Sequence, residues 1–223
     1  MVYIGMIEDD QAEASAVMMS FDINAKHINA QQLSEESFKL YELEKKENFR
    51  EELFEKLMKD IQENKIHCLI VDYKLDTMDE VLEGIEVVDF MHELVPEFPV
   101  IILTDVPERS KKNDSADPDK VYAKEIFMKP DATETKEMVY HIVRNLERYT
   151  KKRSELEIKR DQILDKLVAE SEYDSELYGE LLDIERELSK YVPIEMTVID
   201  KAYDMEDMED ALKVLKEYKS LLE

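Results

Sequence analysis

The chain has 223 residues, of which 38% are charged and 43% are hydrophobic, and its formal net charge at pH 7 is -25. That length is sufficient for one good-sized domain with an appendage, or for two small domains. So large a negative charge argues against direct binding to nucleic acids or to anionic membranes, because both present negative phosphates. The presence of only 3 glycines and 6 prolines argues against a sandwich or barrel built on many tight turns.

The expected location is the cytoplasm. Cys68 is the only cysteine and lies within an apolar run, which is typical of a small core residue and predicts neither a disulfide nor a thiolate metal site. We find no apolar stretch long enough to span a membrane. Residues 1–10 lack the basic start and the apolar core of a secretory signal peptide.

Apolar runs and amphipathic segments alternate through the first two thirds of the chain. Short apolar runs predict strands, and apolar residues at four-residue spacing, such as Phe49, Leu53 and Leu57, predict helices. In chain order we expect a strand at 2–7, a helix at 11–20, a weak strand at 26–33, a helix at 48–64, a strand at 66–71, a helix at 78–94, a strand at 99–104, a polar loop at 107–119, a strand at 125–128 and a long helix from about 133. This alternation predicts an α/β fold with a doubly wound, five-stranded parallel sheet.

The last third of the chain has a different pattern. Apolar residues recur there at alternating spacings of four and three, which predicts a helical hairpin or a coiled coil. The stripe consists of Ile142, Leu146, Tyr149, Leu156, Ile163 and Leu167, with Arg153 and Arg160 at two of its positions, and continues with Leu177, Leu181, Ile184, Leu188 and Tyr191. A further helix is expected between residues 208 and 222. We therefore expect an α/β domain at 1–148 and a helical output or dimerisation region at 149–223.

Polar and charged residues stand where the predicted strands end. Glu8 and Asp9 follow the first strand, Asp72 the third, Thr104 ends the fourth, and Lys129 follows the fifth. In a doubly wound sheet these ends meet at one edge, where such folds bind ligands. Clustered carboxylates repel one another unless a cation is present, and Mg²⁺ binds through carboxylates, water and phosphate oxygens. The pattern suggests a phosphoryl-acceptor site with Asp72 as the nucleophile, where Mg²⁺, Lys129 and Thr104 offset the phosphoryl charge.

Five short motifs occur in the order found in one known family. They are "MIEDD", "LIVDYKL", "LEGIEVVDFM" with Gly84, "PVIILTD" and "IFMKP". On these motifs, residues 1 to about 148 resemble the receiver domain of bacterial two-component response regulators. The resemblance implies a flavodoxin-like sheet of five parallel strands with five surrounding helices, and phosphorylation at Asp72.

The resemblance also implies a role for each matching residue. Asp9 would be a direct Mg²⁺ ligand together with Asp72, Glu8 would assist, and the backbone carbonyl of Lys74 would be a third protein ligand. Thr104 and Lys129 would contact the phosphoryl group and couple it to movement of the following loops.

The chain departs from the pattern of the family at several positions. Asp9 and Asp72 are unusually far apart in sequence, and Asp105 follows Thr104 where the family usually has a small residue. The aromatic switch residue of the family would fall at Ile126, next to Phe127. Because of these departures, the sequence supports the prediction of the phosphorylation site more than the prediction of the usual output switch.

Three functions are compatible with the sequence. The first is a signalling module without a separate enzymatic activity, in which a histidine kinase or phosphotransfer protein phosphorylates Asp72. Residues 149–223 would then bind a protein partner or a second copy of the chain. The second is a phosphorylation-independent pseudo-receiver scaffold. The third, a phosphatase with an aspartyl nucleophile, is disfavoured because Lys74 occupies the position where such enzymes need a second aspartate.

Overall fold

A sheet of five parallel strands, in the order β2-β1-β3-β6-β7, forms the centre of the protein in the computed structural model. The structure describes residues 2–27, 33–41, 48–76, 81–105, 107, 120–169 and 175–193. The strands are β1 (Ile4–Ile7), β2 (Phe38–Tyr41), β3 (Cys68–Asp72), β6 (Val100–Thr104) and β7 (Val121–Ala123). Every residue of β1, β3 and β6 is buried, as expected when helices cover both faces of a parallel sheet. The α/β class and the five parallel strands agree with the sequence.

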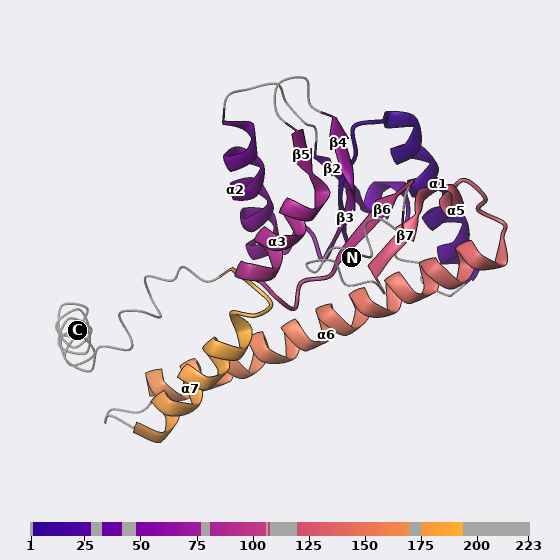
Figure 1. Ribbon diagram of the computed structural model, residues 1–223. Coiled ribbons are helices and arrows are strands. Elements are labelled where there is room, and N and C mark those ends of the chain that lie inside the picture. Colours follow the sequence, from indigo (N-terminus) through magenta and orange to yellow (C-terminus); the bar gives the residue numbers. More distant parts are fainter. Residues whose placement is uncertain are drawn as a thin grey trace. The chain divides into compact units, whose positions relative to one another are not determined.

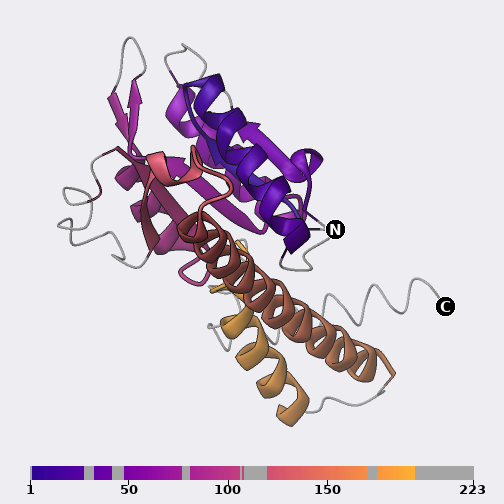
Figure 2. The ribbon, with the colours of Figure 1, turned by 90° about the vertical axis from the view of Figure 1, so that its right-hand side faces the viewer.

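Helices cover both faces of the sheet (Figures 1 and 2). On one face lie α1 (Gln11–His27) and α6 (Thr133–Ala169), and on the other lie α2 (Phe49–Gln62) and α3 (Gly84–Leu94). Alternate strand residues point to opposite faces. The core beneath α1 and α6 is therefore built from every second strand residue: Ile4, Met6, Cys68, Ile70, Ile101 and Leu103, packed with Val17, Phe21, Val139 and Ile142 of the helices.

The direction of winding changes between β1 and β3. The chain passes from β1 outward to β2, and then returns to β3 on the opposite side of β1. This strand order is the flavodoxin-like one, and the change of direction creates a crevice at the carboxyl ends of β1 and β3. The register pairs Ile7 with Val71, so the next residues, Glu8 and Asp72, emerge side by side at that crevice.

The second strand lies later in the sequence than predicted. Helix α1 continues to His27, residues 28–32 lie outside the described part, and β2 pairs with β1 through Phe38–Tyr41. The prediction of a strand at 26–33 is therefore wrong at least for its first two residues. Tertiary packing defines the true strand, because Tyr41 is fully buried and the Phe38 ring packs edge-on against Phe21 at a centroid distance of 5.4 Å.

The fifth strand lies earlier than predicted. Residues Lys124–Phe127 form the single-turn helix α5, and the fifth strand is β7, which pairs with β6. One helical turn brings Lys124 and Phe127, three residues apart, to the same buried side. The Phe127 ring stacks on Phe21 at 5.9 Å. The prediction of a strand at 125–128 is thus wrong, because a short apolar run fits a buried helical turn as well as a strand.

A small antiparallel hairpin separates β3 from α3. It consists of β4 (Lys74–Asp76) and β5 (Val81–Glu83), with Lys74 paired to Glu83. The helix predicted at 78–94 therefore begins only at Gly84. A Cβ atom at Gly84 would lie 2.1 Å from the backbone oxygen of Asp72, so only glycine allows α3 to start directly against the end of β3.

A helical hairpin forms the last described part of the chain. Helix α7 (Ser175–Leu188) lies beside α6 (Figure 2), as the apolar stripe predicts for this pair. A coiled coil and the helix expected between 208 and 222 stay predictions, because residues 194–223 lie outside the described part. Helix α6 runs through residue 148 without interruption, and the compact unit that contains the sheet extends from Met1 to Pro193. None of the described helices is long and apolar enough to cross a lipid bilayer.

One buried arginine of α6 binds the end of α2. The Arg153 guanidinium donates hydrogen bonds to the backbone oxygens of Ile61 (2.7 Å) and Gln62 (3.2 Å). It also donates to the Glu157 carboxylate at 2.9 Å, and only 4% of Arg153 is exposed. These bonds satisfy carbonyl groups that a helix leaves without intrahelical partners at its C-terminus. They explain why an arginine occupies a position in the apolar stripe.

The turn after α7 packs against the loop that leads to β6. The Tyr149 hydroxyl donates to the backbone oxygen of Tyr191 at 2.7 Å, and the Glu97 N–H donates to the backbone oxygen of Lys190 at 2.9 Å. The Tyr149 ring also meets Phe98 edge-on at a centroid distance of 5.3 Å. The helical hairpin is therefore bound to the α/β part through specific hydrogen bonds and aromatic contacts.

Candidate functional site

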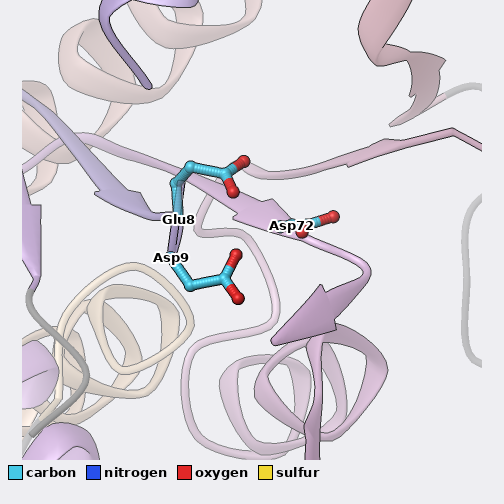
Figure 3. A group of neighbouring side chains, drawn as sticks. All are labelled: Glu8, Asp9 and Asp72. Carbon is cyan, nitrogen blue, oxygen red and sulfur yellow. The ribbon is translucent and has the colours of Figure 1, made fainter. Parts of the chain in front are cut away.

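Three carboxylates meet at the carboxyl ends of β1 and β3 (Figure 3). Glu8, Asp9 and Asp72 each offer an oxygen, and these oxygens all lie within 4.8 Å of one another. Glu8 and Asp72 are 7% and 6% exposed, whereas Asp9 is exposed. The cluster lies at the change in winding direction, where doubly wound folds bind ligands.

The neighbouring Asp10 has a different role, as a cap for helix α1. Its Oδ1 accepts the N–H groups of Ala12 (2.7 Å) and Glu13 (3.1 Å), which are free of intrahelical partners at a helix start. The Asp10 N–H in turn donates to Glu8 Oε1 at 3.2 Å. The cap therefore fixes the turn that directs Glu8 and Asp9 to the cluster.

A buried ammonium group contacts two of these carboxylates, Glu8 and Asp72. Lys124 follows directly after β7, and its Nζ lies 2.9 Å from Glu8 Oε2 and 2.9 Å from Asp72 Oδ2. It also pairs with Glu13 of α1. Only 4% of Lys124 is exposed, so these contacts form where water screens charges little. Three carboxylates contact this one ammonium, and Asp9 adds a fourth carboxylate to the group, so the cluster stays negative when all five groups are charged.

Burial and Lys124 have opposite effects on the carboxylates. Burial raises the pKa of Glu8 to about 7, and the hydrogen bond from Lys124 is the largest effect that opposes this rise. Burial likewise raises the pKa of Asp72, again opposed by Lys124. For Lys124 itself, burial lowers the pKa, but the hydrogen bonds to Glu13, Asp72 and Glu8 together outweigh burial and raise it. The lysine is therefore charged at neutral pH, where Glu8 titrates.

Backbone contacts hold Asp72 at the start of the hairpin. The Lys74 N–H donates to Asp72 Oδ1 at 3.3 Å, and the Gly84 N–H donates to the backbone oxygen of Tyr73 at 2.9 Å. The close approach of Gly84 to the Asp72 backbone supports the same turn from the other side. The expected metal contact of the Lys74 carbonyl stays a prediction.

The other two predicted site residues lie at different places. Thr104 ends β6 and is 3% exposed; since β3 pairs Asp72 with Leu103, Thr104 extends one residue past this pair at the same edge. Lys129 is exposed and lies beyond α5, where its backbone oxygen accepts the Thr135 hydroxyl at 2.7 Å. The lysine that contacts Asp72 is Lys124.

The sequence contains only a weak signal for Lys124. The strand before it has three residues, Val121–Ala123, and follows a polar segment. The more apolar run before Lys129 and Pro130 resembles the family motif more closely. Val121 and Tyr122 are of residue types typical of a strand, but Ala123 separates them from Lys124, and pairing with β6 is what identifies this strand. Glu13 has no such signal, because an acid in the first turn of a helix is common.

The donor set suits a hard divalent cation. Carboxylate oxygens are the protein ligands that Mg²⁺ prefers, with water or phosphate oxygens at its remaining positions. Glu8, Asp9 and Asp72 offer three such oxygens close together. The excess negative charge of the cluster also favours a cation there.

Comparisons of the chain with models of protein families, with curated proteins and with solved structures found no match. The strand order and the position of the acidic cluster define the class of fold as doubly wound α/β with a flavodoxin-like sheet.

Proposed function

We propose that the chain is a cytoplasmic signalling protein of the response-regulator type that accepts a phosphoryl group on Asp72 in a Mg²⁺-dependent reaction. The observation that carries this proposal is the convergence of Glu8, Asp9 and Asp72 with buried Lys124 at the change in winding direction. A nucleophilic carboxylate, acidic metal ligands and a fixed cation are the groups that phosphoryl transfer to an aspartate needs.

The proposed reaction is a transfer between an activated phosphate and Asp72. A carboxylate oxygen of Asp72 attacks phosphorus, the bond to the donor breaks, and the donor leaves with the electron pair. Mg²⁺, held by Glu8, Asp9 and Asp72, would supply positive charge to the phosphoryl oxygens. Lys124 lies 2.9 Å from Asp72 Oδ2, so its ammonium group is close enough to pair with the transferred group. Water later hydrolyses the acyl phosphate.

The donor in this proposal is a histidine kinase or a phosphotransfer protein, and the output is a protein contact of residues 149–223 with a partner or a second copy. The bonds from Arg153 to the end of α2 support a link between the two parts of the chain. A change at the α/β part has a direct route to α6 through them.

The test is phosphorylation of the purified protein by acetyl phosphate, followed by intact-mass measurement. We expect a gain of one phosphoryl group with Mg²⁺, none with EDTA, and none in Asp72→Asn. The matched control is Asp89→Asn, which removes an exposed carboxylate from α3 and should react as the wild type does. A gain that persists in Asp72→Asn, or no gain in the wild type, contradicts the proposal.

A second candidate, the phosphorylation-independent scaffold, is favoured by one observation. Lys124 already pairs with Asp72 and Glu8, so the fold can keep these acids buried without either metal or phosphoryl group. This candidate predicts that acetyl phosphate with Mg²⁺ changes neither the mass nor the hydrodynamic size of the protein. It also predicts that Asp72→Asn leaves partner binding unchanged.

A further inference from the structure

A second concave site lies at the opposite end of the sheet from the carboxylates. A cleft of about 550 Å³ is bounded by the start of β7, by α6 and by the turn after α7. Pro99 and Lys120 contribute from the amino-terminal ends of β6 and β7, whereas Thr104 and Lys124 mark the carboxyl-terminal ends. Its volume is in the usual range for small-molecule sites, roughly 300 to 1,000 Å³.

The cleft is basic, although the chain carries a net charge of -25. Two acids, Glu97 and Glu155, line it together with four cations: Lys120, Arg148, Lys151 and Lys152. Cations gathered in this way repel one another, and a bound anion removes the repulsion. The local charge therefore favours an anionic ligand.

Two of these cations form no ion pair with a carboxylate of the described residues. Arg148 and Lys152 are exposed residues one turn apart on α6, and neither forms an ion pair with any carboxylate in the described part of the chain. Lys151 reaches Glu155 only at 3.9 Å, with both side chains more than half exposed. The charges of Arg148 and Lys152 are therefore available to phosphate oxygens, which lysine and arginine bind through charge-assisted hydrogen bonds.

One wall of the cleft is aromatic. Tyr149 and Tyr191 are buried, with ring centroids 5.9 Å apart, and Tyr122 lies on the neighbouring edge strand. The hydrogen bond from the Tyr149 hydroxyl to the Tyr191 backbone holds these two residues together. Of the three tyrosines only Tyr122 is partly exposed, and aromatic side chains stack on planar ring systems such as nucleobases.

We propose that this cleft binds a nucleoside phosphate. Arg148 and Lys152 contact the phosphates, and the base packs against Tyr122, the partly exposed tyrosine of the wall. The inference does not depend on the proposed phosphorylation of Asp72, because the carboxylate cluster and the cleft share no residue. A ligand in the cleft would contact β7, α6 and Tyr191 together.

The experiment is titration calorimetry of the full chain in EDTA with ADP, GDP, adenosine and pyrophosphate. We expect at least one nucleotide to bind more tightly than either adenosine or pyrophosphate, and to bind more weakly as NaCl is raised. In the double variant Arg148→Gln, Lys152→Gln we expect the nucleotide affinity to fall roughly tenfold or more, because two charge-assisted contacts are lost. Asp72→Asn should bind as the wild type does.

The matched control is Arg144→Gln with Lys159→Gln, which removes the same charge from exposed positions of α6 that do not line the cleft. This control should keep wild-type affinity, and circular dichroism of both double variants verifies folding. Three results would each overturn the proposal: no nucleotide binding at millimolar concentration, pyrophosphate binding as tight as that of the nucleotides, or equal affinities in the two double variants.

Discussion

Lys124 is a site residue that the tertiary structure identifies and that no sequence pattern predicted. It pairs with Glu8, Glu13 and Asp72 within the buried end of the sheet, whereas Lys129, five residues later, is exposed. Because carboxylates without a counter-charge are costly to bury, Lys124 is needed to hold this cluster. The two lysines therefore differ in energetic role.

The first prediction compares these two lysines by substitution. In urea denaturation at pH 8, we expect Lys124→Met to lower the free energy of unfolding by about 3 kcal/mol, because it leaves buried carboxylates without their partner. The control Lys129→Met should change it by less than about 0.5 kcal/mol, as is usual at exposed positions. Similar losses in both variants would contradict the assignment of Lys124 to the cluster.

His67 provides a second prediction for a single residue, on how stability depends on pH. Its Nδ1 accepts the Tyr3 N–H at 3.1 Å, and it is 4% exposed. Burial lowers the pKa of His67 from 6.5 to about 4. Between pH 6.5 and pH 4 His67 binds a proton in the unfolded chain but not in the folded chain. The contribution of neutral His67 to the free energy of unfolding is therefore fully present above pH 6.5 and is lost as the pH falls toward 4.

Urea denaturation of wild type and His67→Asn at pH 7 and pH 5 checks this expectation. Asn Oδ1 can accept the same Tyr3 N–H but does not titrate, so the variant should lose less stability on acidification. The gap between the pKa values of His67 in the unfolded and folded chains corresponds to about 2 kcal/mol of extra stability loss in the wild type between pH 7 and pH 5. Identical losses in the two proteins would show that His67 is not kept neutral by the fold.

At the scale of elements, α6 and α2 are joined by the Arg153 contacts. We expect Arg153→Met to lower the free energy of unfolding by about 2 to 4 kcal/mol, because the backbone oxygens of Ile61 and Gln62 lose a charged donor in a buried place. The measurement is thermal or urea denaturation. Arg160→Met, one heptad later, is the control: its ion pair with Asp161 lies at the surface and should contribute less than about 1 kcal/mol.

Elements with a strong repeating pattern were predictable, and short ones were not. Helices α2 and α6 follow the spacing of their apolar residues, and strands β3 and β6 are continuous apolar runs. By contrast, β7 has only three residues, too few for a period to be recognised, and Lys39 interrupts the apolar residues of β2. The β4–β5 hairpin was also missed, because Val81 fits the apolar spacing of the helix that follows.

At the scale of the whole molecule, the helical hairpin is part of the unit that contains the sheet. The boundary expected at residue 148 falls inside α6, directly before Tyr149 and Arg153. A chain cut there would lose the arginine bonds to α2 and the Tyr149 contacts with Phe98 and Tyr191.

The prediction at this scale compares three shortened chains by thermal unfolding. We expect residues 1–148 to unfold roughly 10 °C or more below residues 1–193, since several kcal/mol of packing are removed from a protein of this size. Residues 1–169, which keep Arg153 but lack Tyr191, should fall between them. Equal midpoints for the shortest and longest chains would show that the hairpin adds nothing to the stability of the sheet.

The sequence by itself determined the α/β class, the parallel sheet, the long helix and the three acids Glu8, Asp9 and Asp72. Those inferences rest on local patterns, since apolar period and the end of a strand are properties of consecutive residues. Only the tertiary structure decided that Lys124 and Glu13 join the acids and that Arg153 binds α2. These contacts connect residues far apart in the chain, and which of two nearby lysines is buried depends on strand pairing that no local pattern specifies.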